Sequence, residues 1–150
     1  MRSYFLLMAV VVAACQTRPT QETAATRPAT RTVPDARLQE TRWVPREIAG
    51  KRISVPANTR EPFLLLRADG TAEGNGSCNR FRGTFFSETP GELRFSPLMN
   101  TRMACPAIDT ENAFISALGQ SSTYRISGDT LRLFSAANAL VARLEAVYLY

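Results

Sequence analysis

The stretch PFLLLRADG at residues 62–70 decides the fold class of the chain. It joins a short apolar run to Asp69 and Gly70, and an Asp-Gly pair in this position is a strong signal for a tight turn between antiparallel strands. The return strand begins at residues 71–73, and the GNG triplet at residues 74–76 then permits a bulge or a turn with positive φ. The sequence therefore predicts a β-hairpin at this point.

Further segments with strand character lie on both sides of this hairpin. They are short, they alternate loosely between apolar and polar residues, and turn residues separate them. They comprise residues 41–48, 81–86, 92–95, 123–127, 130–134 and 139–150. Closely spaced segments with a period of two are typical of antiparallel sheets and barrels. We therefore expect a mainly β domain whose antiparallel sheet is curled into a small barrel-like form.

One segment, residues 109–118, has helical spacing instead. Phe114 and Leu118 lie one helical turn apart, so they face the same side of a helix. Asp109 is a suitable N-cap, and Gly119 is a suitable residue to follow the end of a helix. We expect one helix here, packed on the sheet.

The composition excludes several kinds of chemistry. The chain has 150 residues, a formal charge of +5 and no histidine. Without histidine, Ser–His–Asp and Cys–His catalysis and histidine-ligated zinc are excluded. A nucleophile elbow, a phosphate-cradling loop and a Ser-x-x-Lys motif are missing, and no basic run is interleaved with aromatic residues. We therefore expect a protein that is not an enzyme, uses no metal or other cofactor and binds no nucleic acid.

The N-terminal segment differs from the rest of the chain. Arg2 precedes an apolar run at residues 4–14, which is shorter than the roughly 20 residues of a membrane-spanning helix. The run ends in small residues before Cys15, as a signal peptide does. This cysteine resembles that of the bacterial lipobox, in which cleavage precedes the cysteine and its thiol carries a diacylglycerol. An ordinary secretory signal and a transmembrane anchor are the alternatives.

These features divide the chain into three parts. We expect a lipoprotein signal peptide at residues 1–14, a lipidated Cys15 followed by a disordered Thr/Pro/Arg-rich tether within residues 15–37, and a folded domain at residues 38–150. The tether holds too little apolar surface to offset its ordering entropy. Gln16, rather than aspartate, follows the cysteine. By resemblance to Gram-negative lipoproteins, this residue favours a lipid anchor in the outer membrane, with the domain facing the periplasm.

Two further motifs identify a family. They are GSCNRFRG at residues 76–83 and NTRMACP at residues 100–106, and the predicted helix follows the second one. Together with residues 63–70, and in this order, they resemble the META domain of HslJ-like bacterial lipoproteins. Ser77 stands where that family often has a second glycine. The resemblance implies a mostly antiparallel β fold with one helix, no established catalytic activity, and an association with envelope stress and antibiotic tolerance.

The three cysteines sort into one anchor and one pair. If Cys15 carries lipid, Cys78 and Cys105 remain, and two thiols left in an oxidising envelope most simply form a disulfide. Two free buried thiols and a redox-active pair are the alternatives, although a CxxC arrangement is missing. Two cysteines without histidine supply only half of a tetrahedral metal site.

Four polar residues lie near these cysteines in the sequence: Asn79, Thr101, Arg102 and Glu111. Buried polar groups need hydrogen-bond partners. We therefore hypothesise that Asn79 and Thr101 satisfy backbone groups in irregular loops, and that Arg102 pairs with Glu111 at the start of the helix. The alternative is that the same residues form a site for a partner or ligand.

The sequence supports two hypotheses of function. In the first, a non-enzymatic module is held at the membrane by its N-terminal lipid and contacts another envelope protein or the cell wall. In the second, a small barrel in the periplasm encloses a small hydrophobic molecule. Large side chains such as Phe63, Phe85 and Phe114 favour a filled core over such a cavity. The sequence does not define an oligomeric state.

Overall fold

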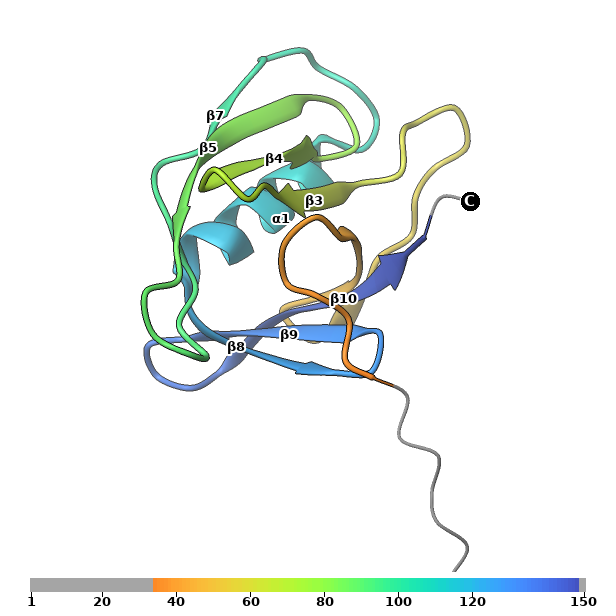
Figure 1. Cartoon of the computed structure of the whole chain (residues 1–150). Helices are drawn as coiled ribbons and strands as arrows, with labels where there is room; N and C mark the ends of the chain where they lie inside the picture. Colours follow the sequence, from red (N-terminus) through yellow and green to blue (C-terminus); the bar gives the residue numbers. More distant parts are fainter. Residues whose placement is uncertain (1–33, 149–150) are drawn as a thin grey trace, which may run out of the picture. The chain divides into compact units, whose positions relative to one another are not determined.

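The computed structural model describes residues 34–148 (Figure 1). The expected signal peptide, Cys15 and nearly all of the tether lie outside the described residues. Within this part of the chain there are ten strands and one helix, and no helix there combines the length and apolarity needed to cross a membrane.

The strands and the helix follow one another with short connections. In chain order they are β1 (Arg42–Ile48), β2 (Lys51–Arg52), β3 (Phe63–Leu66), β4 (Thr71–Asn75), β5 (Arg80–Phe86), β6 (Arg94–Phe95), β7 (Met99–Asn100), α1 (Ile108–Gln120), β8 (Ser121–Ser127), β9 (Thr130–Ser135) and β10 (Leu140–Val147). The sequence patterns predicted all of the longer strands and the helix. They missed β2 and β7, which are too short to show a period.

All paired strands are antiparallel, in the order β6-β5-β4-β3-β1-β10-β9-β8, with β2 on β1 and β7 on β5. The predicted mainly β fold with one helix is confirmed. The predicted curling into a barrel is wrong, because the sheet is neither closed nor strongly curled. β6 is two residues long. Beside it, Glu92 and Thr123 of β8 form an isolated β-bridge and not a continuous ladder of paired residues.

The hairpin predicted from residues 62–70 forms between β3 and β4. Gly70 adopts a φ of 85°, which a residue with a side chain rarely does. The Asp69 carboxylate accepts the backbone N–H of Thr71 at 2.9 Å, and this hydrogen bond lowers the pKa of Asp69. The turn that the GNG triplet permits begins later than the triplet: β4 continues through Asn75, the Gly76 N–H donates to the Asn79 carbonyl at 2.8 Å, and the positive φ falls at Ser77.

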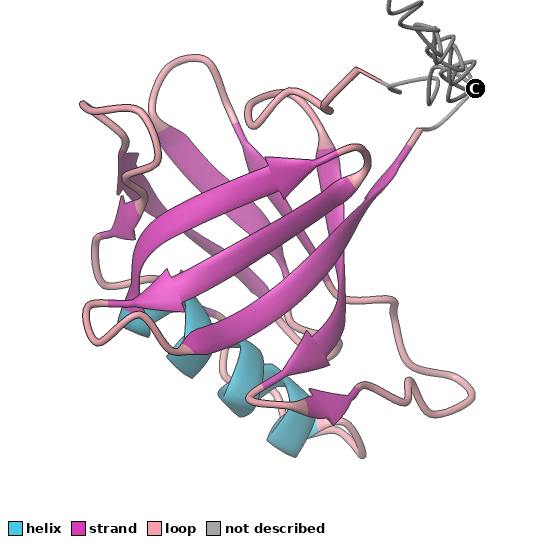
Figure 2. Cartoon of the chain, turned by 90° about the horizontal axis from the view of Figure 1, so that it is seen from below, coloured by secondary structure: helices cyan, strands magenta, loops and turns pink. Residues whose placement is uncertain are grey.

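The hydrophobic core lies between the sheet and α1 (Figure 2). Its centre includes Trp43, Leu64 and Phe114, each of which is fully buried. The rings of Phe81 and Phe114 pack edge to face with their centroids 5.9 Å apart. Burial of each such side chain stabilises the fold by about 1.5–3 kcal/mol.

The ends of α1 differ from those expected. Ala107, rather than Asp109, is the N-cap, and it makes no side-chain capping hydrogen bond. Gly119 lies inside the helix, which runs on until Ser121 begins β8. The buried face of α1 carries Glu111 as well as apolar residues, so a carboxylate enters the protein interior near the start of this helix.

Candidate functional site

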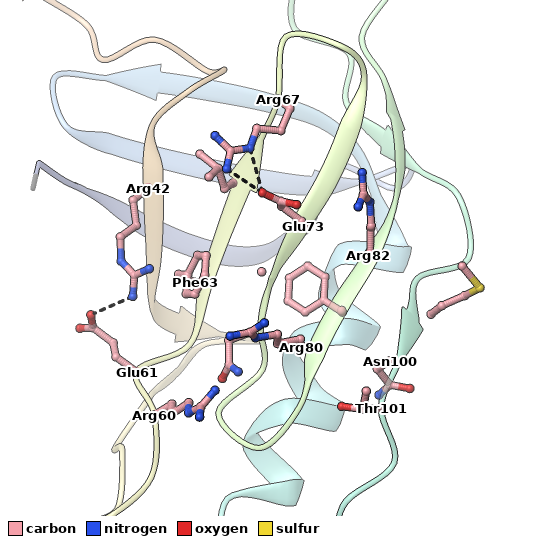
Figure 3. Close-up of a pocket in the computed structure, with 15 residues that line it drawn as sticks. Arg42, Arg60, Glu61, Phe63, Arg67, Glu73, Arg80, Arg82, Asn100 and Thr101 are labelled. Atoms are coloured by element: carbon pink, nitrogen blue, oxygen red, sulfur yellow. Dashed lines mark hydrogen bonds and ion pairs between the residues drawn. The ribbon is translucent and has the colours of Figure 1, made fainter.

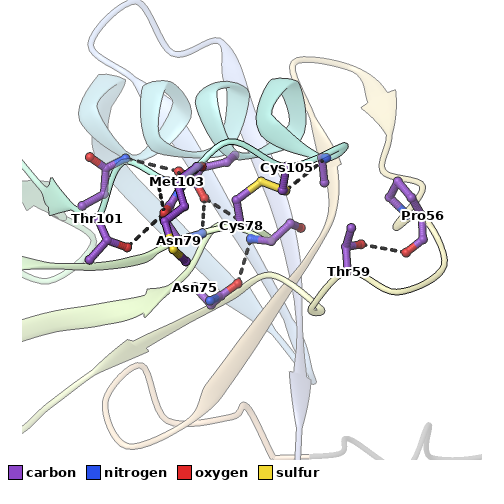
Figure 4. The surroundings of a disulfide bond; sticks show 12 residues. Pro56, Thr59, Asn75, Cys78, Asn79, Thr101, Met103 and Cys105 are labelled. Carbon is purple, nitrogen blue, oxygen red and sulfur yellow. Dashed lines mark hydrogen bonds between the residues drawn. A yellow bond between two sulfur atoms is a disulfide. The ribbon is translucent and has the colours of Figure 1, made fainter.

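The GSCNRFRG and NTRMACP motifs are joined by a disulfide between Cys78 and Cys105 (Figure 4). Their Cα atoms lie 5.8 Å apart, although 27 positions separate them in the sequence. The bond joins the loop that follows β4 to the segment that leads into α1. The disulfide expected from the sequence is therefore present, and it brings the polar residues of both motifs together.

The Glu111 carboxylate lies beside this disulfide and is 1% exposed. Its Oε2 atom accepts the backbone N–H groups of Asn79 at 2.6 Å and Cys78 at 3.2 Å. Its Oε1 atom accepts the side-chain amides of Asn79 at 2.8 Å and Asn100 at 3.3 Å. All four donors are neutral N–H groups, and the carboxylate lies in the first turn of α1, where the helix dipole favours negative charge. We call Glu111, Asn79, Asn100 and Thr101 the glutamate network.

Asn79 connects this carboxylate to the loop before α1. It is 1% exposed, and its Oδ1 atom accepts the backbone N–H of Met103 at 2.8 Å and the Thr101 hydroxyl at 3.0 Å. Its Nδ2 atom donates to the Met103 carbonyl at 3.0 Å as well as to Glu111. The side chain therefore uses both its acceptor and its donors in holding residues 101–103 in place.

Gly76 allows the carboxylate to come this close. A Cβ atom at this position would lie 2.5 Å from Cγ and 2.8 Å from Oε2 of Glu111. Both distances are too short for real contacts, so a larger residue would displace the glutamate. Gly76, the first glycine of the GSCNRFRG motif, is thus explained by the close approach of the Glu111 side chain, not by its backbone conformation.

Arg102 does not join the glutamate network. It is exposed, and within residues 34–148 it makes no ion pair. The expected Arg102–Glu111 pair is wrong, because neutral N–H donors already occupy both carboxylate oxygens. Thr101 and Met103, on either side of Arg102, bond to Asn79, which leaves the arginine side chain on the solvent side of the loop.

Ser77 occupies an unfavourable position in the same loop. Its φ is 107°, a conformation that residues with a side chain rarely adopt. Its buried hydroxyl has no hydrogen-bond partner, although its backbone N–H donates to Asn75 Oδ1 at 2.8 Å. Glycine, which the resemblance to the META domain leads us to expect at this position, would avoid both features.

An open pocket lies next to the glutamate network on the outer face of β3, β4 and β5 (Figure 3). Its volume is about 990 Å³, and its lining includes the five arginines Arg42, Arg60, Arg67, Arg80 and Arg82. We call it the arginine pocket. Asn100, which donates to Glu111, and Thr101, which donates to Asn79, form part of its wall. The network therefore fixes one side of the pocket.

Sequence reasoning missed the arginine pocket. The alternation RFRGTF within β5 places Arg80 and Arg82 on the exposed face and Phe81 on the buried face, and this signal was available in the sequence. The contribution of Arg42 and Arg67 to the pocket could not be predicted from the sequence, because it depends on which strands are neighbours in the sheet. No group of three or more His, Cys, Asp or Glu residues suited to a metal ion occurs in the described part of the chain.

The fold and the two sites define a small, disulfide-bonded, mainly β domain with one helix. A sequence model of the META domain matches residues 36–148, so the chain belongs to the META domain family. The resemblance expected from the motifs is thereby confirmed.

Solved structures show the same fold. A protein from Burkholderia xenovorans, solved by NMR, matches with a TM-score of 0.59 and 25% identity over 75% of this chain and 85% of that chain. A second NMR structure matches with a TM-score of 0.55 and 25% identity, covering 72% of this chain and 90% of its own. No curated protein matches the sequence.

Removal of the disulfide is expected to destabilise the domain. The bond closes a loop of 27 residues, and loop-closure entropy predicts a contribution of about 3.5 kcal/mol to the free energy of unfolding. The double variant Cys78→Ser/Cys105→Ser should lose about this amount in urea denaturation, and reduction of the wild-type protein should have the same effect. An unchanged free energy of unfolding in both experiments would contradict this role.

Replacement of Ser77 by glycine is expected to stabilise the domain by about 1 kcal/mol. The change relieves a positive φ and removes a buried hydroxyl without a partner. Ser121→Gly is the matched control, because Ser121 has a φ of −67° and its hydroxyl donates to the Ala117 carbonyl at 2.9 Å. Thermal denaturation should show a higher Tm for the first variant and a lower Tm for the second. A lower Tm for Ser77→Gly would show that the serine is favourable.

Proposed function

We propose that this META domain is a non-enzymatic, lipid-anchored module of the bacterial envelope. In this proposal the lipid on Cys15 holds it at the outer membrane, facing the periplasm. There it contacts another envelope protein or the cell wall and supports envelope stress responses or antibiotic tolerance. Membership of the META domain family and the lipobox-like sequence before Cys15 support this proposal.

One observation favours a role in binding. Polar side chains of the two motifs form hydrogen bonds inside the domain, whereas arginines of the arginine pocket lie at the surface. Glu111 and Asn79 are almost completely buried, and their side chains form hydrogen bonds with backbone and side-chain amide groups. Arg80 and Arg82 are exposed beside an open pocket. This arrangement suits recognition of a partner better than acid–base chemistry at Glu111.

The alternative, a barrel that encloses a hydrophobic ligand, receives less support. The sheet is not closed, and the space between the sheet and α1 is occupied by large buried side chains, including those of Trp43, Phe114 and Leu118. The arginine pocket lies on the outside of the sheet and carries charged residues. A function through surface contacts is therefore the proposal that we retain.

Substitution of Cys15 tests the anchor and the contacts together. A Cys15→Ser variant expressed in bacteria cannot accept a thioether-linked lipid, so the protein should leave the membrane fraction. Its mature mass should contain no acyl groups. Crosslinking in intact cells should capture envelope proteins with the wild-type protein and fewer of them with the variant.

Gln16→Asp is the matched control, since it keeps the cysteine. This variant should stay in the membrane fraction, and by resemblance to Gram-negative lipoproteins it should move from the outer to the inner membrane in a density gradient. Membrane fractionation of Cys15→Ser equal to that of the wild-type protein would contradict the anchor. Crosslinks of the wild-type protein to lipid alone would contradict the partner-binding function.

A further inference from the structure

We propose that the arginine pocket binds a ligand that carries two or more phosphate groups. The inference deepens the proposed binding function, since it names a chemical class of ligand for this surface. It does not depend on the lipid anchor or on a protein partner, because the pocket belongs entirely to the folded domain.

The positive charge of the pocket exceeds its negative charge. Five arginines line it together with the two glutamates Glu61 and Glu73. Arg67 donates to Glu73 at 2.8 Å and to Glu40 at 3.1 Å, and these hydrogen bonds raise the pKa of Arg67. Arg42 lies 3.8 Å from Glu61. Glu61 also accepts a hydrogen bond from Arg46 at 3.3 Å, so both glutamates of the pocket are already paired.

The other three arginines of the pocket are available to a ligand. Arg60, Arg80 and Arg82 are exposed, and none of them forms an ion pair with another residue in the described ranges. Guanidinium groups match phosphate oxygens in bidentate geometry. Because a concave surface with an excess of one sign of charge concentrates its field, the net positive charge of the pocket should attract anions.

Strand geometry sets the spacing of these charges. Arg80 and Arg82 lie two positions apart on one face of β5, so their Cα atoms are about 7 Å apart. Across the sheet, Arg80 pairs with Asn75 and Arg82 pairs with Glu73. Long arginine side chains with this spacing reach two oxyanion groups of one ligand. A single phosphate would leave part of the charge unpaired.

Asn75 adds an amide donor to this site. It lines the pocket and is only 3% exposed. Its Oδ1 atom is held by the Ser77 N–H, whereas its Nδ2 atom donates no hydrogen bond within residues 34–148. This amide is not among the fully buried side-chain atoms of the described residues that lack a partner, so it is accessible and can donate to an anionic oxygen in the pocket.

The pocket also has apolar parts. The guanidinium of Arg42 lies 3.7 Å from the centre of the Phe63 ring, and Leu65 of β3 and Met99 of β7 also line the pocket. This surface suits the carbon framework to which phosphate groups are attached. The volume of about 990 Å³ is large enough for a small organic molecule.

The test measures binding of sodium tripolyphosphate to the purified full chain by isothermal titration calorimetry at low salt. The double variant Arg80→Gln/Arg82→Gln should weaken binding at least tenfold. Arg125→Gln/Arg132→Gln is the matched control, because it removes the same charge from β8 and β9, away from the pocket. This control should bind within twofold of the wild-type protein. Added salt should weaken wild-type binding.

A parallel experiment with vesicles identifies the source of the phosphate. Cosedimentation compares vesicles containing cardiolipin, which carries two phosphate groups in one molecule, with vesicles of phosphatidylcholine alone. Binding to tripolyphosphate that requires Arg80 and Arg82 supports a soluble ligand, and binding to cardiolipin vesicles alone with the same requirement supports a lipid headgroup. The proposal is overturned if the wild-type protein binds neither probe, or if the control variant loses as much affinity as the pocket variant. Thermal denaturation of both variants checks that they are folded.

Discussion

The carboxylate of Glu111 is the group on which the rest of this domain depends. It lies in the interior, where an unsatisfied charge would be strongly destabilising. Four N–H donors from the loop after β4 and from Asn100 compensate for this burial. These donors can converge only if the loop, β7 and α1 take the positions seen here. The requirement to satisfy one carboxylate therefore fixes segments that the sheet alone leaves free.

The disulfide and the glutamate network act on the same loops in different ways. The Cys78–Cys105 bond limits how far the two loops can separate, whereas the hydrogen bonds of Asn79 and Glu111 fix their orientation. Asn100 and Thr101 take part in this network and also line the arginine pocket. The interior network thus determines the shape of a surface that we propose to be functional.

Local sequence patterns predict local structure in this chain, and they fail where distant segments meet. The Asp-Gly turn, the strand at residues 41–48 and the helix were all recognisable, because each depends on neighbouring residues. Local patterns could not show that the sheet stays open. Closure of a sheet depends on contacts between its two edges, here on the length of β6 and on its position relative to β8.

The candidate site shows the same limit. The cysteine pair could be expected from the number of cysteines, and Asn79 and Glu111 from their proximity to it. The partner of Glu111 was misassigned to Arg102, since opposite charges suggested an ion pair. The structure supplies backbone and amide donors instead, and nothing in the sequence marks a backbone N–H as the partner of a carboxylate.

A double-mutant cycle on Asn79 and Glu111 tests most directly whether the buried carboxylate organises these loops. The free energy of unfolding is measured for the wild-type protein, Asn79→Ala, Glu111→Gln and the double variant, with Asp109→Asn as an exposed control in the same helical turn. The account predicts that each single variant loses about 2–4 kcal/mol and that the two losses are non-additive by more than about 1 kcal/mol, because both disrupt one network. Additive losses, or a loss for Glu111→Gln no larger than that for Asp109→Asn, would contradict it.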